Sequence, residues 1–598
     1  MSKFFNSNQV KYFVFYYRRL KWRIPVLMVF SAIVALLDGI GLTLFVPLFT
    51  IAETGNTGGE DLGKLAFVVD FFNSMGISLT VGAIILLMLG LFILKGIVNY
   101  IDRYFFTRVR VNFMKQTRIQ LIEGLCNISY PGFVNIDMGR IQNVITAEIG
   151  KAVGAFMSYF AAIQSGIMLA GYLTLAFLAN FQFALIIAVA GITSNYIYKF
   201  INKKVETASL WQSLIGNGLQ SKVLEAVWNY KYLKATDLIS TYRKKLVQIT
   251  NEAEDLSMKM GKLNAVSASI REPITIGIVC AVIFVQVVLM DASVLSMIVS
   301  LMFFYRSLTN LMALQNNWQS FLVSSGGIHT VNELYDEFEE KIESRTDDPV
   351  ENFNNGIEFN HVTFSYAPHL PIVLNDINLT IKKNQTVAFV GESGSGKTTI
   401  VNMLAGLLMP VSGQLKIDGI PLTVSRVKGF RHHIGYITQE PVVFNDTVFN
   451  NVTFHESVND ETVARFRETL EKTALTSMVE NLPEKENSLL GDNGILISGG
   501  QKQRISIARE LYRDCSLLLM DEATSALDTE NELIIQSNIN ALKGKYTIVI
   551  IAHRLSTVKN ADVIYLLDKG KIEASGSFDE LKNKSPRFRK MVELQDFS

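Results

Sequence analysis

Gly391-Glu-Ser-Gly-Ser-Gly-Lys-Thr398 is the most informative segment of this 598-residue chain. It fits the pattern GxxxxGK[ST], follows a strand-like apolar run at 386–390 and precedes a helix-like run at 399–408. Glycines let consecutive backbone N–H groups turn toward a phosphate, and the N-terminus of the next helix adds a favourable dipole. The segment therefore predicts the P-loop of an α/β nucleotide-binding domain.

The P-loop assigns expected roles to individual side chains. Lys397 would reach the β- and γ-phosphates of ATP, and the Thr398 hydroxyl would coordinate Mg²⁺. We expect ATP to contact Gly391, Glu392, Ser393, Gly394, Ser395, Gly396, Lys397, Thr398 and Thr399.

An apolar run that ends in two carboxylates supplies the expected hydrolytic groups. Residues 517–520, Leu-Leu-Leu-Met, suit a strand buried on both faces, and Asp521 and Glu522 follow it directly. Asp521 would hold Mg²⁺, and Glu522 would be the general base for the attacking water. A lone acidic pair is sometimes an inert turn, but its place behind a P-loop favours catalysis.

The segment Ile497-Ser-Gly-Gly-Gln501, followed by Lys-Gln-Arg504, resembles the LSGGQ signature of ABC transporter ATPases. Ile497 stands where the family has leucine, and the swap keeps an apolar side chain. The resemblance implies that this segment binds the γ-phosphate of an ATP held by a second subunit. The implied contacts are Ser498, Gly499, Gly500 and Gln501.

Further positions are similar to family motifs. Gln439 resembles the Q-loop glutamine that senses Mg²⁺ and the membrane domain, His553 the switch histidine on the γ-phosphate, and Tyr366 the aromatic that stacks on adenine. Ser525-Ala-Leu-Asp528 resembles the D-loop. Singly, such residues are more often structural, but their order around the P-loop favours function. Leu490-Gly-Asp-Asn-Gly494 departs from the family pattern VGERG, so communication between domains is expected to differ in detail.

The first half of the chain is apolar and contains candidate membrane helices. A helix needs roughly 20 apolar residues to cross the hydrocarbon core. Basic residues at 18–23, 105–151 and 199–271 and acidic residues at 51–79 place the N-terminus and the second half of the chain in the cytoplasm. The six candidate spans are 24–50, 80–104, 152–178, 181–200, 273–290 and 293–315.

The predicted fold joins two unlike domains. A helical membrane domain of the exporter type, with six spans and long cytoplasmic extensions, occupies 1–335, and an acidic linker covers 336–355. The helical periodicity of 109–128 and 221–260 predicts that these segments are helical extensions into the cytoplasm. An α/β P-loop NTPase domain with an ABC helical subdomain covers 356–598. Its short β-rich runs alternate with helical stretches, and they include 357–364, 385–390, 516–520, 547–551 and 563–567. The resemblance implies coupling helices near 133–140 and 223–232. We expect a multi-pass protein of the bacterial inner (cell) membrane.

Several partners follow from these features. If the P-loop and the signature of one site come from different subunits, one ATPase domain cannot complete a site, so the resemblance implies a dimer, most simply a homodimer. The expected cofactors are ATP and Mg²⁺. A net charge of +1 gives no general attraction to nucleic acid, and no such partner is expected. Cys126, Cys280 and Cys515 form no CxxC pair and are expected to be free thiols.

The transported substrate is predicted from weaker signals. Charges within spans usually face a cavity or one another, so they could line a path for an anionic headgroup, or simply reach the interface at span ends. The residues concerned are Asp38, Lys95, Asp102, Arg103 and Arg306. The amphipathic segment 62–76 resembles the external helix of lipid-linked oligosaccharide flippases, although an external helix without a substrate role fits equally well.

The leading hypothesis is ATP-driven flipping or export of an amphiphile, either a lipid or a lipid-linked oligosaccharide, across the lipid bilayer. A peptide, protein or drug exporter of the same fold is the alternative. Glu522 argues against a gated channel, since such family members usually have a damaged ATPase site. The candidate spans exclude a soluble ATPase, and the fusion of membrane and ATPase parts in this order disfavours an importer.

Overall fold

The computed structural model describes most of the chain and divides it into two compact units. The helical unit holds residues 1–128 and 132–341, and the α/β unit holds 129–131 and 342–598. The described residues are 16–17, 20–45, 47–48, 51, 80–179, 181–284, 294–344, 348, 350, 353–521, 537, 540–552 and 558–596.

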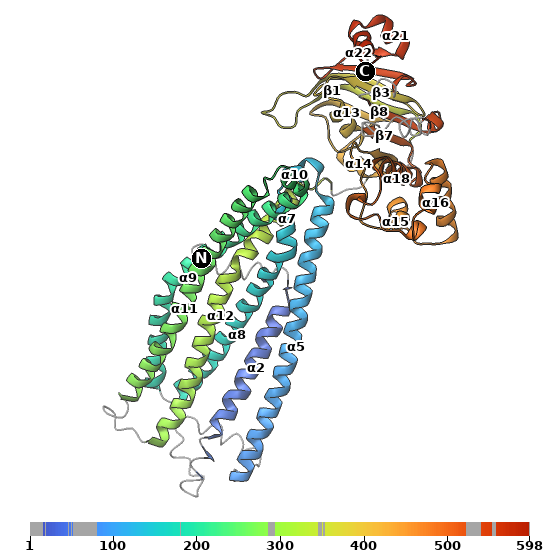
Figure 1. The fold of residues 1–598 in the computed structure, drawn as a ribbon. Coiled ribbons are helices and arrows are strands. Elements are labelled where there is room, and N and C mark those ends of the chain that lie inside the picture. Colours follow the sequence, from blue (N-terminus) through green and yellow to red (C-terminus); the bar gives the residue numbers. More distant parts are fainter. Residues whose placement is uncertain are drawn as a thin grey trace. The chain divides into compact units, whose positions relative to one another are not determined.

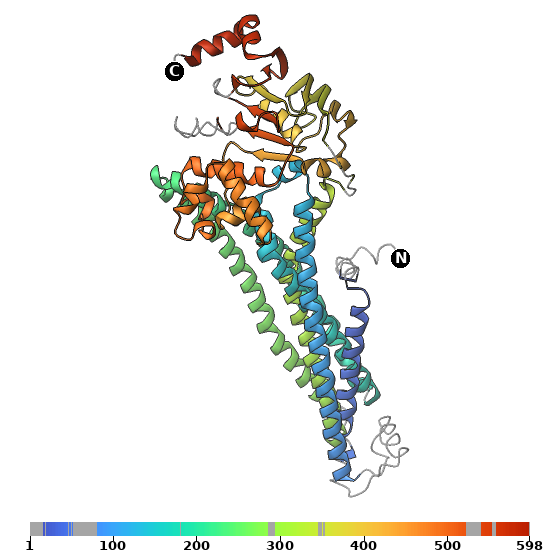
Figure 2. The same cartoon turned by 90° about the vertical axis from the view of Figure 1, so that its right-hand side faces the viewer.

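Long helices that run side by side build the helical unit (Figure 1; Figure 2). At about 1.5 Å per residue, the 47 residues of α5 extend over about 70 Å, more than twice the roughly 30 Å hydrocarbon core of a bilayer. The elements are α2 (Arg23–Thr43), α5 (Val81–Asn127), α6 (Tyr130–Val134), α7 (Met138–Asn143), a π-helical turn (Val144–Glu148), α8 (Ile149–Ala179), α9 (Phe181–Trp228), α10 (Tyr230–Ala235), α11 (Ile239–Phe284) and α12 (Val294–Glu340).

Within the described residues, three helical stretches are long and apolar enough to cross a membrane. They are Arg23–Thr43, Val81–Asn127 and Met138–Phe177. These stretches contain most of the first three predicted spans. Of the other predicted spans, 181–200 lies in α9, 273–284 lies in α11 and 294–315 lies in α12. Residues 285–290 and 293 of these spans and the whole of segment 62–76 lie outside the described residues.

Close packing around two consecutive glycines holds the centre of this bundle. A Cβ on Gly326 would lie 2.4 Å from the carbonyl oxygen of Ser209, and one on Gly327 would lie 2.9 Å from that of Glu148. Both positions therefore admit only glycine, which lets α12 approach α9 and α8 closely. A cluster of buried aromatic rings, with Phe156 stacked on Phe106 and Phe113, fills the neighbouring core.

The structure corrects one predicted helix. The sequence pattern suggested an unbroken helix over 221–260, but α9 ends at Trp228 and α11 begins at Ile239, with α10 between them. The Asn229 side chain donates to the Glu225 carbonyl oxygen, and Asp237 takes a positive φ of 57°, a conformation outside a right-handed helix. Asn and Asp form such local turns more readily than most residues, and the pattern of apolar residues does not register this.

Two sheets form the α/β unit. The first has the antiparallel order β2-β1-β4-β5, and the second has the order β10-β9-β3-β8-β7-β6, in which β9, β3, β8, β7 and β6 pair in parallel. The strands are β1 (Gly356–Phe364), β2 (Leu374–Lys382), β3 (Thr386–Gly391), β4 (Ser412–Ile417), β5 (Ile420–Pro421), β6 (Ile434–Ile437), β7 (Leu517–Asp521), β8 (Thr547–Ile551), β9 (Val563–Asp568) and β10 (Lys571–Gly576).

Helices pack around these sheets. Helix α13 (Lys397–Leu404) follows β3, and α14 (Val424–Arg431) precedes β6. Helices α15 to α18 share a separate apolar core and form the helical subdomain, orange in Figures 1 and 2. Its members are α15 (Val448–Thr453), α16 (Asp460–Lys472), α17 (Thr476–Glu480) and α18 (Gly499–Tyr512), and α21 (Phe578–Lys584) and α22 (Pro586–Asp596) end the chain.

The register of the parallel strands brings their carboxyl ends to one edge. Phe389 of β3 pairs with Ile551 of β8, Ile551 pairs with Asp521 of β7, and Ile437 of β6 pairs with Met520. Every residue of β7 and β8 is buried, so these strands are fixed by packing on both faces. Loops that follow β3, β6, β7 and β8 therefore start at the same edge of the sheet, where α/β domains place their ligands.

Candidate nucleotide-binding site

The P-loop leaves β3 in a conformation that side chains would obstruct. Gly394 and Gly396 have φ values of 81° and 104°, which residues with a Cβ rarely adopt. A Cβ on Gly391 would lie 2.3 Å from the Leu567 carbonyl oxygen, whereas one on Gly394 would meet nothing within 4 Å. The loop is thus closed toward the sheet and open at Gly394, as a phosphate cradle requires.

Two polar side chains of this loop are buried and suited to an anion. Lys397 is 5% exposed, and its Nζ lies 2.8 Å from the carbonyl oxygen of Gly391 and 2.9 Å from that of Glu392. The Ser395 hydroxyl is buried and has no hydrogen-bond partner among the described residues. A buried hydroxyl without a partner is costly, so a phosphate oxygen at the loop would relieve this cost.

The predicted Mg²⁺ ligands come from three separate segments. Thr398 lies exposed in the first turn of α13, Asp521 ends β7 and is 9% exposed, and Gln439 follows β6 by two residues. Hydroxyl, carboxylate and amide oxygens are the hard ligands that Mg²⁺ prefers, so this donor set fits the ion. Among the described residues, no cluster of three or more His, Cys, Asp or Glu side chains forms another candidate metal site.

Two predicted catalytic residues, Glu522 and His553, lie outside the described residues, as do Ser525 and Asp528. In sequence, Glu522 follows the last residue of β7, and His553 follows β8 by two residues. Both strands end at the edge that carries the P-loop. Their catalytic roles stay predictions.

Tyr366, the predicted adenine-stacking residue, lies beside the P-loop helix. Its side chain is 57% exposed, its hydroxyl is 3.3 Å from the Thr399 hydroxyl, and its ring packs edge-on against Phe364. An exposed ring that is held at its edge leaves a face available for stacking on a base.

The signature segment begins helix α18. Ser498 is the N-cap: its hydroxyl accepts from the Gln501 N–H at 3.3 Å, and the Gln501 side chain accepts from the Ser498 N–H at 2.8 Å. Gly499 is exposed, and an added Cβ would meet nothing within 4 Å. The Gln501 side chain therefore caps the helix, while Ser498 and Gly499 face open space in this chain. Ile497 is buried in the core of the helical subdomain, which explains why an apolar residue suffices there.

The segment 490–494, which departs from the VGERG pattern, is hydrogen-bonded to the loop before α15 and to α18. Gly491, Asn493 and Gly494 all have positive φ values. The Asn445 side chain donates to the Asp492 carboxylate at 2.6 Å, and Lys502 of α18 donates to the Asn493 carbonyl oxygen at 2.7 Å. The altered sequence thus still forms a fixed connection to the signature helix.

Sequence reasoning missed two arginines. Arg587 of α22 lies 2.9 Å from the Glu392 carboxylate of the P-loop and 2.8 Å from Asp568, and these two carboxylates raise its pKa. Arg509 of α18 is buried and donates to the carbonyl oxygens of Asn451 at 2.7 Å and Val442 at 2.9 Å. Burial lowers its pKa. Neither residue lies in a recognisable motif, and only the fold brings their partners near.

The charged residues of the candidate spans do not form a single path. Lys95 pairs with Asp38, whose carboxylate also accepts from the Tyr172 hydroxyl. Asp38 is 2% exposed. Among the described residues, no carboxylate forms an ion pair with Arg306, which is half-buried. Lys95 therefore already has a counter-ion within the protein. Arg306 is the better candidate to bind an anionic headgroup.

Comparisons with known proteins agree with this architecture. The family model described as ABC transporter transmembrane region matches residues 27–313, and the family model described as ABC transporter matches residues 374–525. An ATP-dependent lipid A-core flippase of Ralstonia nicotianae is 28% identical over 530 residues, which cover 85% of this chain and 86% of the relative. A protein of the same name from Burkholderia pseudomallei is 29% identical over 524 residues, covering 85% of each chain.

A solved structure has the same fold. A bacterial Atm1-family ABC exporter with ATP bound superposes with a TM-score of 0.77 at 22% identity, over 96% of this chain and 98% of the other. The predicted fold class, a helical membrane domain of the exporter type fused to an α/β ATPase domain, is confirmed. The chain belongs to the ABC transporter family and combines its transmembrane region with its ATPase domain.

Proposed function

We propose that two copies of this chain form an ATP-driven flippase for a lipid or lipid-linked glycan. The strongest support is the P-loop, whose buried Lys397 lies at the same sheet edge as Asp521. The same chain also contains helices that are long and apolar enough to cross a membrane. The ATPase chemistry and the membrane domain then belong to one polypeptide, so ATP turnover can drive movement across the bilayer.

Each residue at the sheet edge has a defined task in hydrolysis. Lys397 would leave the carbonyl oxygens of the P-loop and bind the β- and γ-phosphates, where its charge stabilises the charge that develops in transfer. Glu522 would accept the proton of the attacking water, and His553 would hold the γ-phosphate. Thr398, Asp521 and Gln439 would hold Mg²⁺, which neutralises phosphate charge when bound.

The signature segment explains why a dimer is needed. Ser498 and Gly499 begin α18 with exposed polar and backbone groups, and a helix N-terminus of this kind binds phosphate. We assign this surface to the ATP held by the P-loop of the second copy. ATP would close the dimer and hydrolysis would reopen it, so each turnover would switch the helical units between two states.

The substrate class rests on the relatives and on the candidate spans. Relatives from Ralstonia nicotianae and Burkholderia pseudomallei are named ATP-dependent lipid A-core flippases. Arg306, half-buried and without an ion pair among the described residues, is suited to an anionic headgroup within the membrane. We place the transporter in the bacterial inner membrane with the ATPase domain in the cytoplasm.

Two measurements test this function. Glu522→Gln in the full-length protein should abolish turnover yet trap ATP with the domains closed, and unchanged turnover would remove Glu522 as the base. ATPase activity in nanodiscs should rise with lipid-linked sugars and anionic glycolipids, and Arg306→Ala should reduce this stimulation. A flat response across the lipid panel, or stimulation by peptides and drugs alone, would contradict a lipid flippase.

A further inference from the structure

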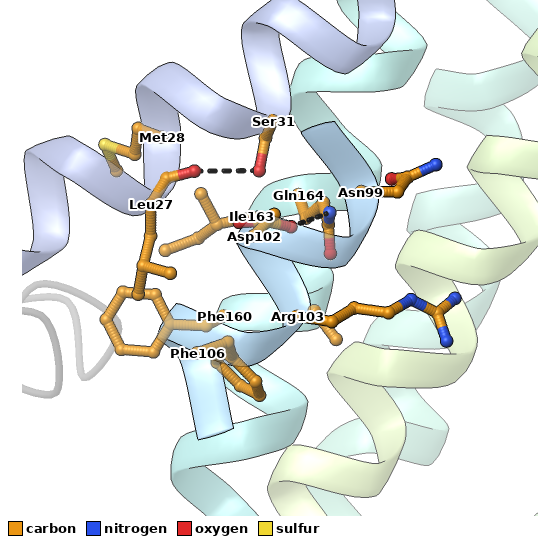
Figure 3. A pocket seen from close by; sticks show the side chains of 11 residues that line it. Leu27, Met28, Ser31, Asn99, Asp102, Arg103, Phe106, Phe160, Ile163 and Gln164 are labelled. Carbon is orange, nitrogen blue, oxygen red and sulfur yellow. Dashed lines mark hydrogen bonds between the residues drawn. The ribbon is translucent and has the colours of Figure 1, made fainter. Parts of the chain in front are cut away.

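A small cavity lies between α2, α5 and α8, far from the P-loop in the sequence. Its volume is about 130 Å³. Polar and apolar side chains share its wall, and Figure 3 shows them from close by. The lining includes Ser31, Asp102, Arg103, Phe106, Phe160 and Gln164.

Two charged residues line this cavity, the carboxylate of Asp102 and the guanidinium of Arg103. Asp102 is 6% exposed, and one of its carboxylate oxygens accepts from the Gln164 amide at 3.2 Å (Figure 3). Among the described residues, no lysine, arginine or histidine forms an ion pair with it. The guanidinium of Arg103 points away from the carboxylate in Figure 3. The Ser31 hydroxyl donates to the Leu27 carbonyl oxygen at 3.0 Å, so it does not donate to the Asp102 carboxylate.

A buried carboxylate within a membrane helix needs a compensating cation. A charged carboxylate that stays buried and unpaired loses its hydration without compensation, so such groups pair with a cation or become neutral. Lys95, which precedes Asp102 by seven residues in α5, already forms an ion pair with Asp38 of α2. At about 1.5 Å per residue this separates the two sites by roughly 10 Å, so Lys95 does not serve Asp102.

Exposed aromatic side chains place the cavity near the membrane interface. Tyr100 and Tyr104 are 72% and 62% exposed and stack on each other on either side of Asp102 in α5. Trp22, 64% exposed, lies against Phe105. Exposed Tyr and Trp gather at the headgroup level of a bilayer, so lipid headgroups are the molecules that reach this depth.

We propose that this cavity binds the primary ammonium headgroup of a membrane lipid, with the Asp102 carboxylate as its acceptor. The ammonium donates to the carboxylate oxygen, and the rings of Phe106 and Phe160 add favourable cation–π contacts. Pockets for drug-sized ligands begin at roughly 300 Å³, so the cavity admits an aminoethyl group but no sugar headgroup. The bound lipid is therefore a partner distinct from the transported glycolipid.

The proposal makes a definite prediction of selectivity. A primary ammonium has three N–H donors, whereas a trimethylammonium has none and is bulkier, and an anionic headgroup would be repelled by Asp102. A charge-assisted hydrogen bond contributes enough to change affinity about tenfold or more. Phosphatidylethanolamine should therefore be retained about tenfold better than phosphatidylcholine and phosphatidylglycerol.

Native mass spectrometry of the full-length protein tests this selectivity. The protein in detergent is mixed with equal amounts of phosphatidylethanolamine, phosphatidylcholine and phosphatidylglycerol of distinct mass, and the retained lipids are counted. Asp102→Asn should lose the preference and Asp102→Glu should keep it. Asp255→Asn, which removes an exposed carboxylate from α11, should change nothing.

A second variant keeps the test decisive if Asp102→Asn fails to fold. Ala161→Met fills the cavity while Asp102 remains, and it should remove the same bound lipid. Equal retention of the three lipids by the wild type, or a preference that survives both variants, would overturn the proposal and leave the cavity to water. Displacement of the lipid by soluble ethanolamine at equal concentration would overturn the assignment to a lipid. The readout is binding, so its failure is separate from failure of the proposed flippase activity.

Discussion

Lys397 in the α/β unit and Lys95 in the helical unit are both withdrawn from solvent, yet their ammonium groups have different acceptors. Lys397 donates to two backbone carbonyl oxygens of its own loop. Lys95 is paired with the carboxylate of Asp38, 57 residues away in another helix. The first lysine is held by neutral groups that a phosphate can replace, whereas the second already has its counter-ion.

The backbone explains this difference. In a long helix nearly every N–H and C=O group is used by the helix itself, so a buried charge must find another side chain. Glu148 follows the same rule, since Lys151 and Ser213 donate to its two oxygens at 2.7 and 2.8 Å. Loops and strand ends of the α/β unit leave backbone groups available, and these hold Lys397 and Arg509. Lys397 is therefore held by groups that a ligand can replace, whereas Lys95 and Glu148 each have a charged partner in another part of their helical unit or helix.

Replacing the two lysines separately gives the largest expected effects. Lys397→Met should lower ATP hydrolysis by about 100-fold or more, because the charge that stabilises the transferring phosphate is lost. The thermal stability should change little, since the two freed carbonyl oxygens can accept from water. Steady-state ATPase activity and the apparent Tm of the full-length protein measure both quantities. Lys571→Met, at an exposed site on β10, is the matched control and should leave turnover intact.

Lys95→Met should act on stability instead. It leaves the Asp38 carboxylate buried without a cation, and removal of one partner of a buried pair costs about 3 kcal/mol or more. We expect a lower apparent Tm in nanodiscs and recovery of most of the loss in the double variant Lys95→Met/Asp38→Asn.

The opposite outcome would break the comparison between the lysines. If Lys95 binds an anionic headgroup, Lys95→Met would abolish lipid-stimulated ATPase activity with little change in Tm. The double variant would then restore nothing.

Much of the fold could be predicted from the sequence. The runs at 357–364, 547–551 and 563–567 lie in β1, β8 and β9, because buried strands of β-branched and aromatic residues give a strong pattern. Strands β2 and β4 were missed, because β4 begins with three exposed residues and two consecutive exposed residues, Asn375 and Asp376, interrupt the alternation in β2. The break near Asn229 was also missed, because local turn chemistry decided it.

The candidate site divides in the same way. The P-loop and the signature could be located because specific backbone shapes require glycine at fixed spacings, and a single segment carries each motif. The Asp38–Lys95–Tyr172 cluster and the Arg587–Glu392 pair could not be predicted, because they join residues 57 to 195 positions apart through the packing of separate elements. No local pattern encodes such a pairing.

A smaller effect should follow from a carboxylate that the backbone holds. Asp418, in the turn between β4 and β5, accepts from the N–H groups of Asn354, Asn355 and Gly356 at 2.7, 2.7 and 2.8 Å. Burial raises the pKa of Asp418, but these three donors outweigh burial, so its pKa lies below the usual value. Asp418→Asn should destabilise the α/β unit by about 1 kcal/mol at pH 7.

The pH dependence of this loss identifies its cause. A carboxyl group whose pKa is depressed by folding stabilises the protein above its unfolded pKa, about 3.9, and this contribution disappears as the pH falls through the lower folded pKa. The apparent Tm of wild type and Asp418→Asn should therefore differ at pH 7 and converge as the pH falls below about 4. Asp255→Asn should show no comparable difference, since that carboxylate is exposed. A gap for Asp418→Asn that stays constant with pH would mean that side-chain shape, rather than charge held by backbone N–H groups, fixes this turn.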